Sequence, residues 1–216
     1  MRLWYTTGDV TALRELPRNR VVCLDVETTG LNPNTGEILQ VALVRGDETV
    51  LLSSHVRPGR HVRWPAAQRV NGISPEMVAG RPSLSSLSQE LERHLCGAAL
   101  IVGYNVAFDL AFVRAAGISC GSAPVFDVMR EFAPVVGRRH GGGRDYSWVS
   151  LERCARHYGI RFRAHDALED ARATLRCFWS MLECGPARGS SAAARSYLSV
   201  VADHASEKSC GGVQDE

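Results

Sequence analysis

Two acidic residues at the end of an apolar run have the types and spacing that metal-dependent chemistry requires. Asp25 and Glu27 are two residues apart and follow Val21, Val22 and Leu24. In a β-strand, residues two apart project from the same face. Two carboxylates held together in apolar surroundings are costly unless a cation lies with them. We therefore predict that this pair binds a cation and is not a single surface acid at a strand end.

Two further segments carry residues that can complete such a site. Asp109 lies one turn into an apolar helical segment, and His165 precedes Asp170 by five residues. On one continuous helix this spacing would turn the two side chains apart by about 140°. They converge only if His165 precedes the helix, on an accessible loop suited to a general base. Each residue has an ordinary explanation when taken alone: a solvated acid near a helix N-terminus and a surface histidine.

The three segments together resemble a known family. Residues 23–33, 102–110 and 165–171 are similar, in order and spacing, to the three exonuclease motifs of the DnaQ-like (DEDDh) 3′–5′ exonucleases, and the resemblance covers residues 20–182. It implies that two Mg²⁺ or Mn²⁺ ions, which prefer carboxylate oxygen, are held by Asp25, Glu27, Asp109 and Asp170. It also implies that His165 takes a proton from the attacking water.

The resemblance further implies hydrolysis of phosphodiester bonds from a free 3′ end, with release of nucleoside 5′-monophosphates. The segment 27–30 favours DNA, in proofreading or repair, and a DNA polymerase subunit is an implied partner. One alternative is an exoribonuclease that trims RNA 3′ ends. A second alternative is a non-catalytic nucleic-acid-binding or polymerase-accessory module. Such a module would be marked by the loss of a catalytic acid, and none is missing.

Substrate contacts are also expected from the resemblance. Thr28 and Leu31 match family positions that contact the terminal nucleotide, and Asn105 is a third candidate, besides being a candidate helix cap. The chain departs from the family at Tyr104, where the family commonly has His, and this affects local packing or substrate contact only. Residues 70–74 resemble a family segment or form a simple Asn-Gly turn. The basic stretch 137–144 either touches phosphates or is a solvated loop.

Periodicity and turn residues indicate the elements that position these side chains. Three strands are expected at 20–26, 37–45 and 48–56, with a tight turn at Gly46-Asp47. Apolar residues at helical spacing then alternate with short buried strands. Helices are expected after Ser83, Asn105, Asp127 and Ser150 and over the last motif, and short strands at 98–103 and 125–126.

This pattern predicts an α/β protein with a mixed sheet, in which a three-stranded antiparallel meander is followed by alternating helices and strands that pack on it. The family resemblance implies that this architecture is ribonuclease-H-like. We expect an N-terminal extension at 1–19 and an exonuclease domain at 20–184. Residues 185–216, rich in Ser, Ala and Gly, are expected to form a mostly disordered tail.

The composition excludes several other classes. The chain has 45% hydrophobic and 22% charged residues, which is typical of a globular protein, and no run long enough to span a membrane. Its seven cysteines form no CxxC pair, which argues against a disulfide framework or a zinc site and for a reducing cytoplasm. The net charge of +2 does not by itself indicate nucleic-acid binding.

Overall fold

The computed structural model describes residues 10–136 and 146–184 of the chain. At its centre is a five-stranded sheet in the order β3-β2-β1-β4-β5. The first three strands form an antiparallel meander, and β4 and β5 join it parallel to β1. The expected mixed α/β sheet is therefore confirmed. The strands are β1 (Val21–Thr28), β2 (Ile38–Arg45), β3 (Val50–His55), β4 (Leu100–Gly103) and β5 (Val125–Asp127).

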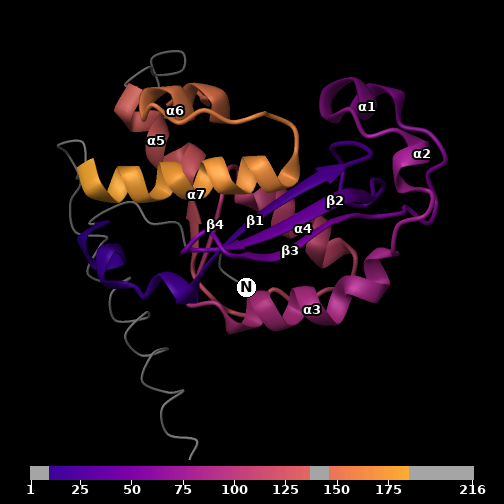
Figure 1. Ribbon diagram of the computed structural model, residues 1–216, viewed down its shortest axis with the longest axis horizontal. Coiled ribbons are helices and arrows are strands. Elements are labelled where there is room, and N and C mark those ends of the chain that lie inside the picture. Colours follow the sequence, from indigo (N-terminus) through magenta and orange to yellow (C-terminus); the bar gives the residue numbers. More distant parts are fainter. Residues whose placement is uncertain (1–9, 137–145, 185–216) are drawn as a thin grey trace, which may run out of the picture.

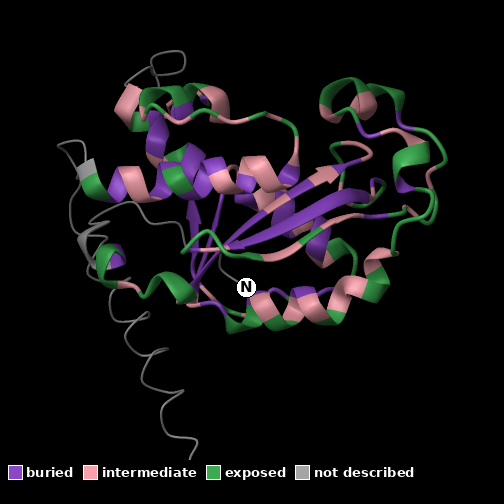
Figure 2. Cartoon of the chain, viewed as in Figure 1, coloured by how far each residue is buried: buried purple, intermediate pink, exposed green. Residues whose placement is uncertain are grey.

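Helices cover both faces of the sheet (Figure 1). One face carries the long α7 (Ala167–Cys184), with α5 (Val128–Val136) and α6 (Leu151–His157) packed beyond it. The other face carries α3 (Leu84–Gly97) and α4 (Val106–Ala115). Buried residues colour the central strands almost without interruption in Figure 2, as expected for a sheet covered on both sides.

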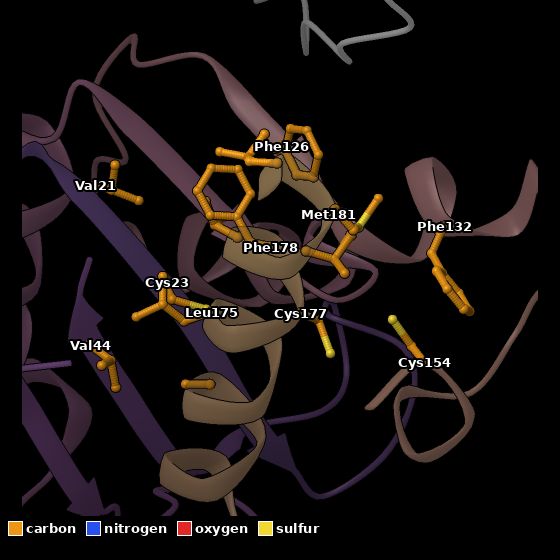
Figure 3. Close-up of a cluster of buried hydrophobic side chains, with 14 of the residues drawn as sticks. Val21, Cys23, Val44, Phe126, Phe132, Cys154, Leu175, Cys177, Phe178 and Met181 are labelled. Atoms are coloured by element: carbon orange, nitrogen blue, oxygen red, sulfur yellow. The ribbon is translucent and has the colours of Figure 1, made fainter. Parts of the chain in front are cut away.

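Alternate residues of β1 enter two separate cores. Val21 and Cys23 pack under α7 together with Phe178 (Figure 3), and the Phe178 ring meets Phe126 of β5 edge-on at 4.9 Å between centroids. Val22 and Leu24 face α3 and α4 in the second core. This alternation fixes which face each later residue of β1 uses, because side chains in a strand change sides at every step.

Several elements lie in segments for which we expected none. Between β3 and α3 the chain forms α1 (Pro65–Asn71) and α2 (Pro75–Val78), which are too short for an apolar periodicity to appear in the sequence. Gly72 ends α1 in a left-handed conformation, so the Asn-Gly pair is a helix terminus. Two 3₁₀ helices, η1 (Val10–Glu15) and η2 (Arg18–Arg20), precede β1.

The expected division of the chain into three parts stays a prediction. Within 1–19, Leu13 is buried against the core under α7, and the Arg14 side chain donates a hydrogen bond to Leu182 O at the end of α7. The expected tail at 185–216 and the basic stretch at 137–144 lie outside the described residues.

The helices expected after Ser83 and Ser150 are confirmed, and both serines cap them with their side chains. The hydroxyls of Ser83 and Ser150 each accept a hydrogen bond from the backbone N–H three residues later. The expected side-chain cap from Asn105 is wrong, although Asn105 does occupy the position before α4. Its backbone is left-handed, with φ 59°, whereas a capping residue needs an extended backbone.

The junction between β4 and α4 leaves no room for a side chain at Gly103. A Cβ atom there would lie 2.6 Å from Val106 Cβ and 3.1 Å from Leu24 O. Glycine therefore lets the first turn of α4 pack directly on β1. This close approach sets the position of Asp109 one turn later.

We predict that Gly103→Ala destabilises the protein by about 1–3 kcal/mol, because the added methyl group overpacks the junction against the Val106 side chain and Leu24 O. Gly97→Ala is the matched control, since a Cβ at Gly97 meets nothing within 4 Å. Urea denaturation of the two variants measures the difference. Equal stability of both variants and the wild type would show that the junction can relax.

Candidate active site

Asp25 and Glu27 project from the same face of β1, as expected. They continue the alternation of Val21 and Cys23, so they lie on the face covered by α7. Both residues pair with β2, where Asp25 is opposite Ala42 and Glu27 opposite Gln40. Pairing with β4 ends earlier, at Cys23, so the acids lie where β1 extends beyond its parallel neighbour.

Asp109 reaches the same place from the other side of the sheet. It is only 3% exposed, and its Oδ1 accepts a hydrogen bond of 2.9 Å from Val26 N, between the two strand acids. That N–H lies beyond the last residue of β1 that pairs with β4. Asp109 thus satisfies a strand-end donor that would otherwise be buried without a partner.

The start of α7 is fixed by two side chains. Gln40, buried in β2, accepts a 3.2 Å hydrogen bond from Ala167 N, the first residue of the helix. Asp166 accepts bonds from Leu168 N and Glu169 N, which is the bonding of a helix cap. These contacts hold the first turn of α7, and with it Asp170, against the sheet.

His165 lies just before α7, as the spacing required. Its backbone is left-handed, with φ 65°, and its N–H donates a 3.2 Å hydrogen bond to Asp170 Oδ2. The residue is exposed. The reversal of the chain at His165 therefore brings its side chain back toward the acid five residues later, which a continuous helix would not do.

Within the described residues, Glu27, His165 and Asp170 each offer a ligand atom, and these atoms lie within 4.8 Å of one another. Asp170 Oδ1 is buried and has no hydrogen-bond partner in the part of the chain that is described. A buried carboxylate oxygen without a partner is costly, and a hard cation would supply the missing partner. The carboxylate oxygens of this group are the ligand type that Mg²⁺ and Mn²⁺ prefer.

The four acids also perturb one another. Burial first, and then the charges of Asp109, Asp170 and Glu27, raise the pKa of Asp25 well above its usual range. Burial likewise raises the pKa of Asp109 well above its usual range, although the Val26 N–H opposes the shift. Burial is also the main cause that raises the pKa of Glu27 to about 7, and burial together with the charge of Glu27 raises that of Asp170 to about 7. Without a cation the site therefore retains protons near neutral pH.

The three candidate substrate contacts differ in what they offer. Leu31 is 86% exposed, in the connection between β1 and β2. Thr28 is buried, and its hydroxyl and carbonyl are already used, since Oγ1 donates to Gly30 O and the carbonyl accepts from Asn71 Nδ2. Asn105 donates its N–H to Asp127 Oδ1, and its side chain makes no capping bond.

Three residues that support the site were missed from the sequence or assigned a lesser role. Gln40 could not be identified from the sequence, because a single glutamine in an apolar strand belongs to no recognisable motif. Asn71, at the end of α1, forms a hydrogen bond with Glu27 that holds its pKa lower. Asp127 was expected only as the cap of α5, and it does accept from Met129 N, but its Oδ1 also accepts from Asn105 N in the second motif.

Comparison with known proteins gives a consistent result. The model of the RNase T family, described as an exonuclease family, matches residues 22–178. A DNA polymerase III subunit epsilon-like protein of Rhodobacter capsulatus is 34% identical over 84% of this chain, and the match spans 27% of that protein. The DNA polymerase III subunit epsilon of Treponema pallidum is 27% identical over 73% of this chain and 74% of that protein.

Solved structures agree on the fold. Escherichia coli exonuclease I in complex with a dA16 oligonucleotide superposes with a TM-score of 0.59 at 21% identity, over 72% of this chain and 39% of that one. At this identity the likeness shows the fold alone, and it confirms the expected ribonuclease-H-like architecture. The chain spans 27%, 11% and 12% of three curated relatives that it matches, so it corresponds to only a part of those proteins. None of the described helices combines the length and the hydropathy needed to span a membrane.

We predict that the metal-free protein becomes less stable as pH rises from about 4 to 7. The pKa values of Glu27 and Asp170 rise to about 7 on folding, against about 4 in an unfolded chain. The folded state therefore binds more protons in this window, and its stabilisation is lost as those protons leave. We expect the loss to be on the order of 2 kcal/mol.

Thermal melts in EDTA at successive pH values, repeated with Mn²⁺, measure this effect. The double variant Glu27→Gln, Asp170→Asn should show a flatter profile than wild type, and Mn²⁺ should stabilise the wild type most at high pH. Glu183→Gln, an exposed acid near the end of α7, is the control. Parallel profiles for wild type and the double variant would mean that folding does not raise the pKa values of the two acids as described.

Proposed function

Since the chain belongs to the RNase T exonuclease family and is thus a nuclease, we propose that it is a metal-dependent 3′–5′ exonuclease that removes nucleoside 5′-monophosphates from the 3′ end of DNA. One observation carries this proposal. The ligand atoms of Glu27, His165 and Asp170 lie within 4.8 Å of one another beside Asp25 and Asp109, and one oxygen of Asp170 is buried without a partner. Acids with raised pKa values around a candidate base form a site that a cation would complete.

In this proposal, Asp25, Glu27, Asp109 and Asp170 would hold two Mg²⁺ or Mn²⁺ ions. Such ions, when bound, stabilise the attacking and leaving oxygens of an in-line phosphoryl displacement. The chain's own part is to fix the acids in place before substrate arrives. Asp109 does so through its bond to Val26 N, and Asp170 through α7, whose first N–H is held by Gln40.

His165 is proposed as the general base that accepts a proton from the attacking water. Its exposure gives access to solvent, and the bond from its own N–H to Asp170 Oδ2 keeps the loop beside the acids. A base mounted on a loop can approach a bound water without disturbing the carboxylates on the rigid elements.

Substrate binding is proposed to begin at the connection after β1. The exposed Leu31 side chain would contact the terminal nucleotide. Thr28, whose hydroxyl is already used within the chain, would contribute through its backbone, and Asn105 through its amide. DNA is the proposed substrate because relatives named as DNA polymerase III subunit epsilon or epsilon-like proteins match most of this chain. The same names support a DNA polymerase subunit as partner, and by extension a cytoplasmic location.

The experiment that tests this function uses 5′-labelled single-stranded DNA and RNA of one sequence, with Mg²⁺ or with EDTA. We expect a ladder of products shortened from the 3′ end of DNA, slower shortening of RNA, and no reaction in EDTA. Asp25→Asn, Glu27→Gln, Asp109→Asn and Asp170→Asn should each lose roughly 100-fold or more of the rate, because each weakens metal-dependent stabilisation worth several kcal/mol.

Other outcomes have definite meanings. Turnover in EDTA would exclude a metal-dependent reaction. Preferred shortening of RNA would identify an exoribonuclease, and binding without hydrolysis would identify a non-catalytic module. Glu183→Gln serves again as the matched acid-to-amide control.

His165→Ala is predicted to lose about 10²–10⁴ in rate, the usual contribution of general base catalysis. Affinity for Mn²⁺, measured by calorimetry, should change little, because His165 is proposed to act on water and not as a ligand. Its ring nitrogen does lie among the possible ligand atoms. A variant that loses Mn²⁺ affinity together with activity would therefore show that His165 is a metal ligand instead.

A further inference from the structure

A pocket opens directly beside the candidate active site, and most of the residues that line it have no role in the chemistry proposed above. It has a volume of about 350 Å³, and His165 and Asp170 form one wall. The other walls come from α5, the start of α6 and the segment that leads to α7, and they present mainly the apolar side chains of Met129, Trp148 and Phe162. An apolar pocket that shares a wall with a catalytic site is a natural place for part of the substrate.

Trp148 is the unusual member of this lining. Its side chain is 80% exposed, although the next residue, Val149, is buried in the core. The indole is therefore held near the surface by an anchored backbone and is not simply on a long loose loop. A large aromatic surface left in water beside a reactive site gains free energy when another flat apolar group covers it.

Tyr104 ties this aromatic residue to the second motif. Its hydroxyl donates a 2.6 Å hydrogen bond to Val149 O, immediately after Trp148. Tyr104 occupies the position between Gly103, where α4 closes on β1, and Asn105, which precedes α4. The residue that departs from the expected family pattern thus connects the catalytic acids to the segment that carries Trp148.

The charges around the pocket select the kind of group that it can accept. Among the described residues that line it, none is Arg or Lys, whereas Glu152 and Asp170 are both acidic. Away from the proposed metal ligands, a phosphate would be repelled by Glu152. A nucleobase suits the pocket, since it is uncharged, has a flat face for stacking, and carries N–H groups that can donate hydrogen bonds to a carboxylate.

We propose that Trp148 stacks on the base of the nucleotide on the 5′ side of the scissile bond, and that Tyr104 positions it for this contact. The inference rests on the proposed function and specifies how that site holds a single-stranded 3′ end. The terminal nucleotide is proposed to lie toward Leu31 and α1. The α5 and α6 side lies across the end of β1 from α1 (Figure 1), which is where the preceding nucleotide would be placed.

The first test compares Trp148→Ala with Trp148→Phe. With single-stranded DNA and Mg²⁺, the alanine variant should raise KM by about 5- to 100-fold with little change in kcat, since stacking on an aromatic side chain typically contributes about 1–3 kcal/mol per base. The phenylalanine variant should recover most of the affinity. Tyr104→Phe should show an intermediate rise in KM. Val62→Ala is the matched control, because Val62 is 81% exposed and lies outside the pocket.

The second test locates the base. The rate of the first cleavage is measured, at substrate concentrations below KM, on oligonucleotides that carry one abasic site at successive positions from the 3′ end. With the abasic site at the first position 5′ of the scissile bond, wild type should fall to the rate of Trp148→Ala, and the variant should lose nothing more. With the abasic site at any other position, the wild type should still cleave faster than Trp148→Ala. Equal loss for both proteins at every position would overturn the proposal, as would a Trp148→Ala variant with wild-type KM.

A binding measurement separates this inference from the proposed function. Fluorescence anisotropy of a labelled single-stranded oligonucleotide in EDTA reports affinity without hydrolysis. A wild-type protein that binds through Trp148 but does not hydrolyse DNA would support the stacking site and refute the exonuclease assignment. Hydrolysis by a wild type whose affinity is unaffected by Trp148→Ala would refute the stacking site alone.

Discussion

The burial of four carboxylates close together at one end of β1 is the constraint on which the rest of the structure depends. Burial is the main cause that raises the pKa values of Asp25, Glu27, Asp109 and Asp170, and the charge of at least one neighbouring acid adds to the shift in every case. Such a cluster is stable only when the surrounding elements hold it more firmly than the charges push it apart. The free-energy cost of holding these carboxylates together arises at the place where a bound cation would remove it. The clustering of the acids is therefore the cause both of this cost and of the proposed activity.

Hydrogen bonds from backbone N–H groups hold two of these carboxylates in place. Asp109 accepts from Val26 N, and Asp170 Oδ2 accepts from His165 N, while Asp170 Oδ1 keeps no partner among the described residues. Of the two strand acids, Glu27 has a hydrogen bond with Asn71, and both lie on a strand flanked by two packed cores. The four acids thus lie on strands and helices, whereas His165 lies on the segment just before α7.

The surroundings of the acids distinguish this chain from the family pattern more than the acids themselves do. Tyr104 bonds to the backbone beside Trp148, and the same segment borders an apolar pocket next to His165. Variation around a common set of acids is the usual way in which one fold serves different substrates.

The sequence by itself determined the meander, most of the helices and the five residues of the candidate site. These features depend on local periodicity and on spacing within single segments, such as the two-residue step from Asp25 to Glu27. Only the tertiary structure revealed Gln40 at the start of α7, the bond from Val26 to Asp109 and the left-handed turns at Asn105 and His165. Each of these joins residues distant in the chain or depends on a backbone angle set by packing.

The short helices α1 and α2 bury little apolar surface of their own, so they left no pattern in the sequence. The role of Trp148 was also visible only in the tertiary structure, because its exposure beside His165 follows from the buried position of Val149 and not from its own residue type.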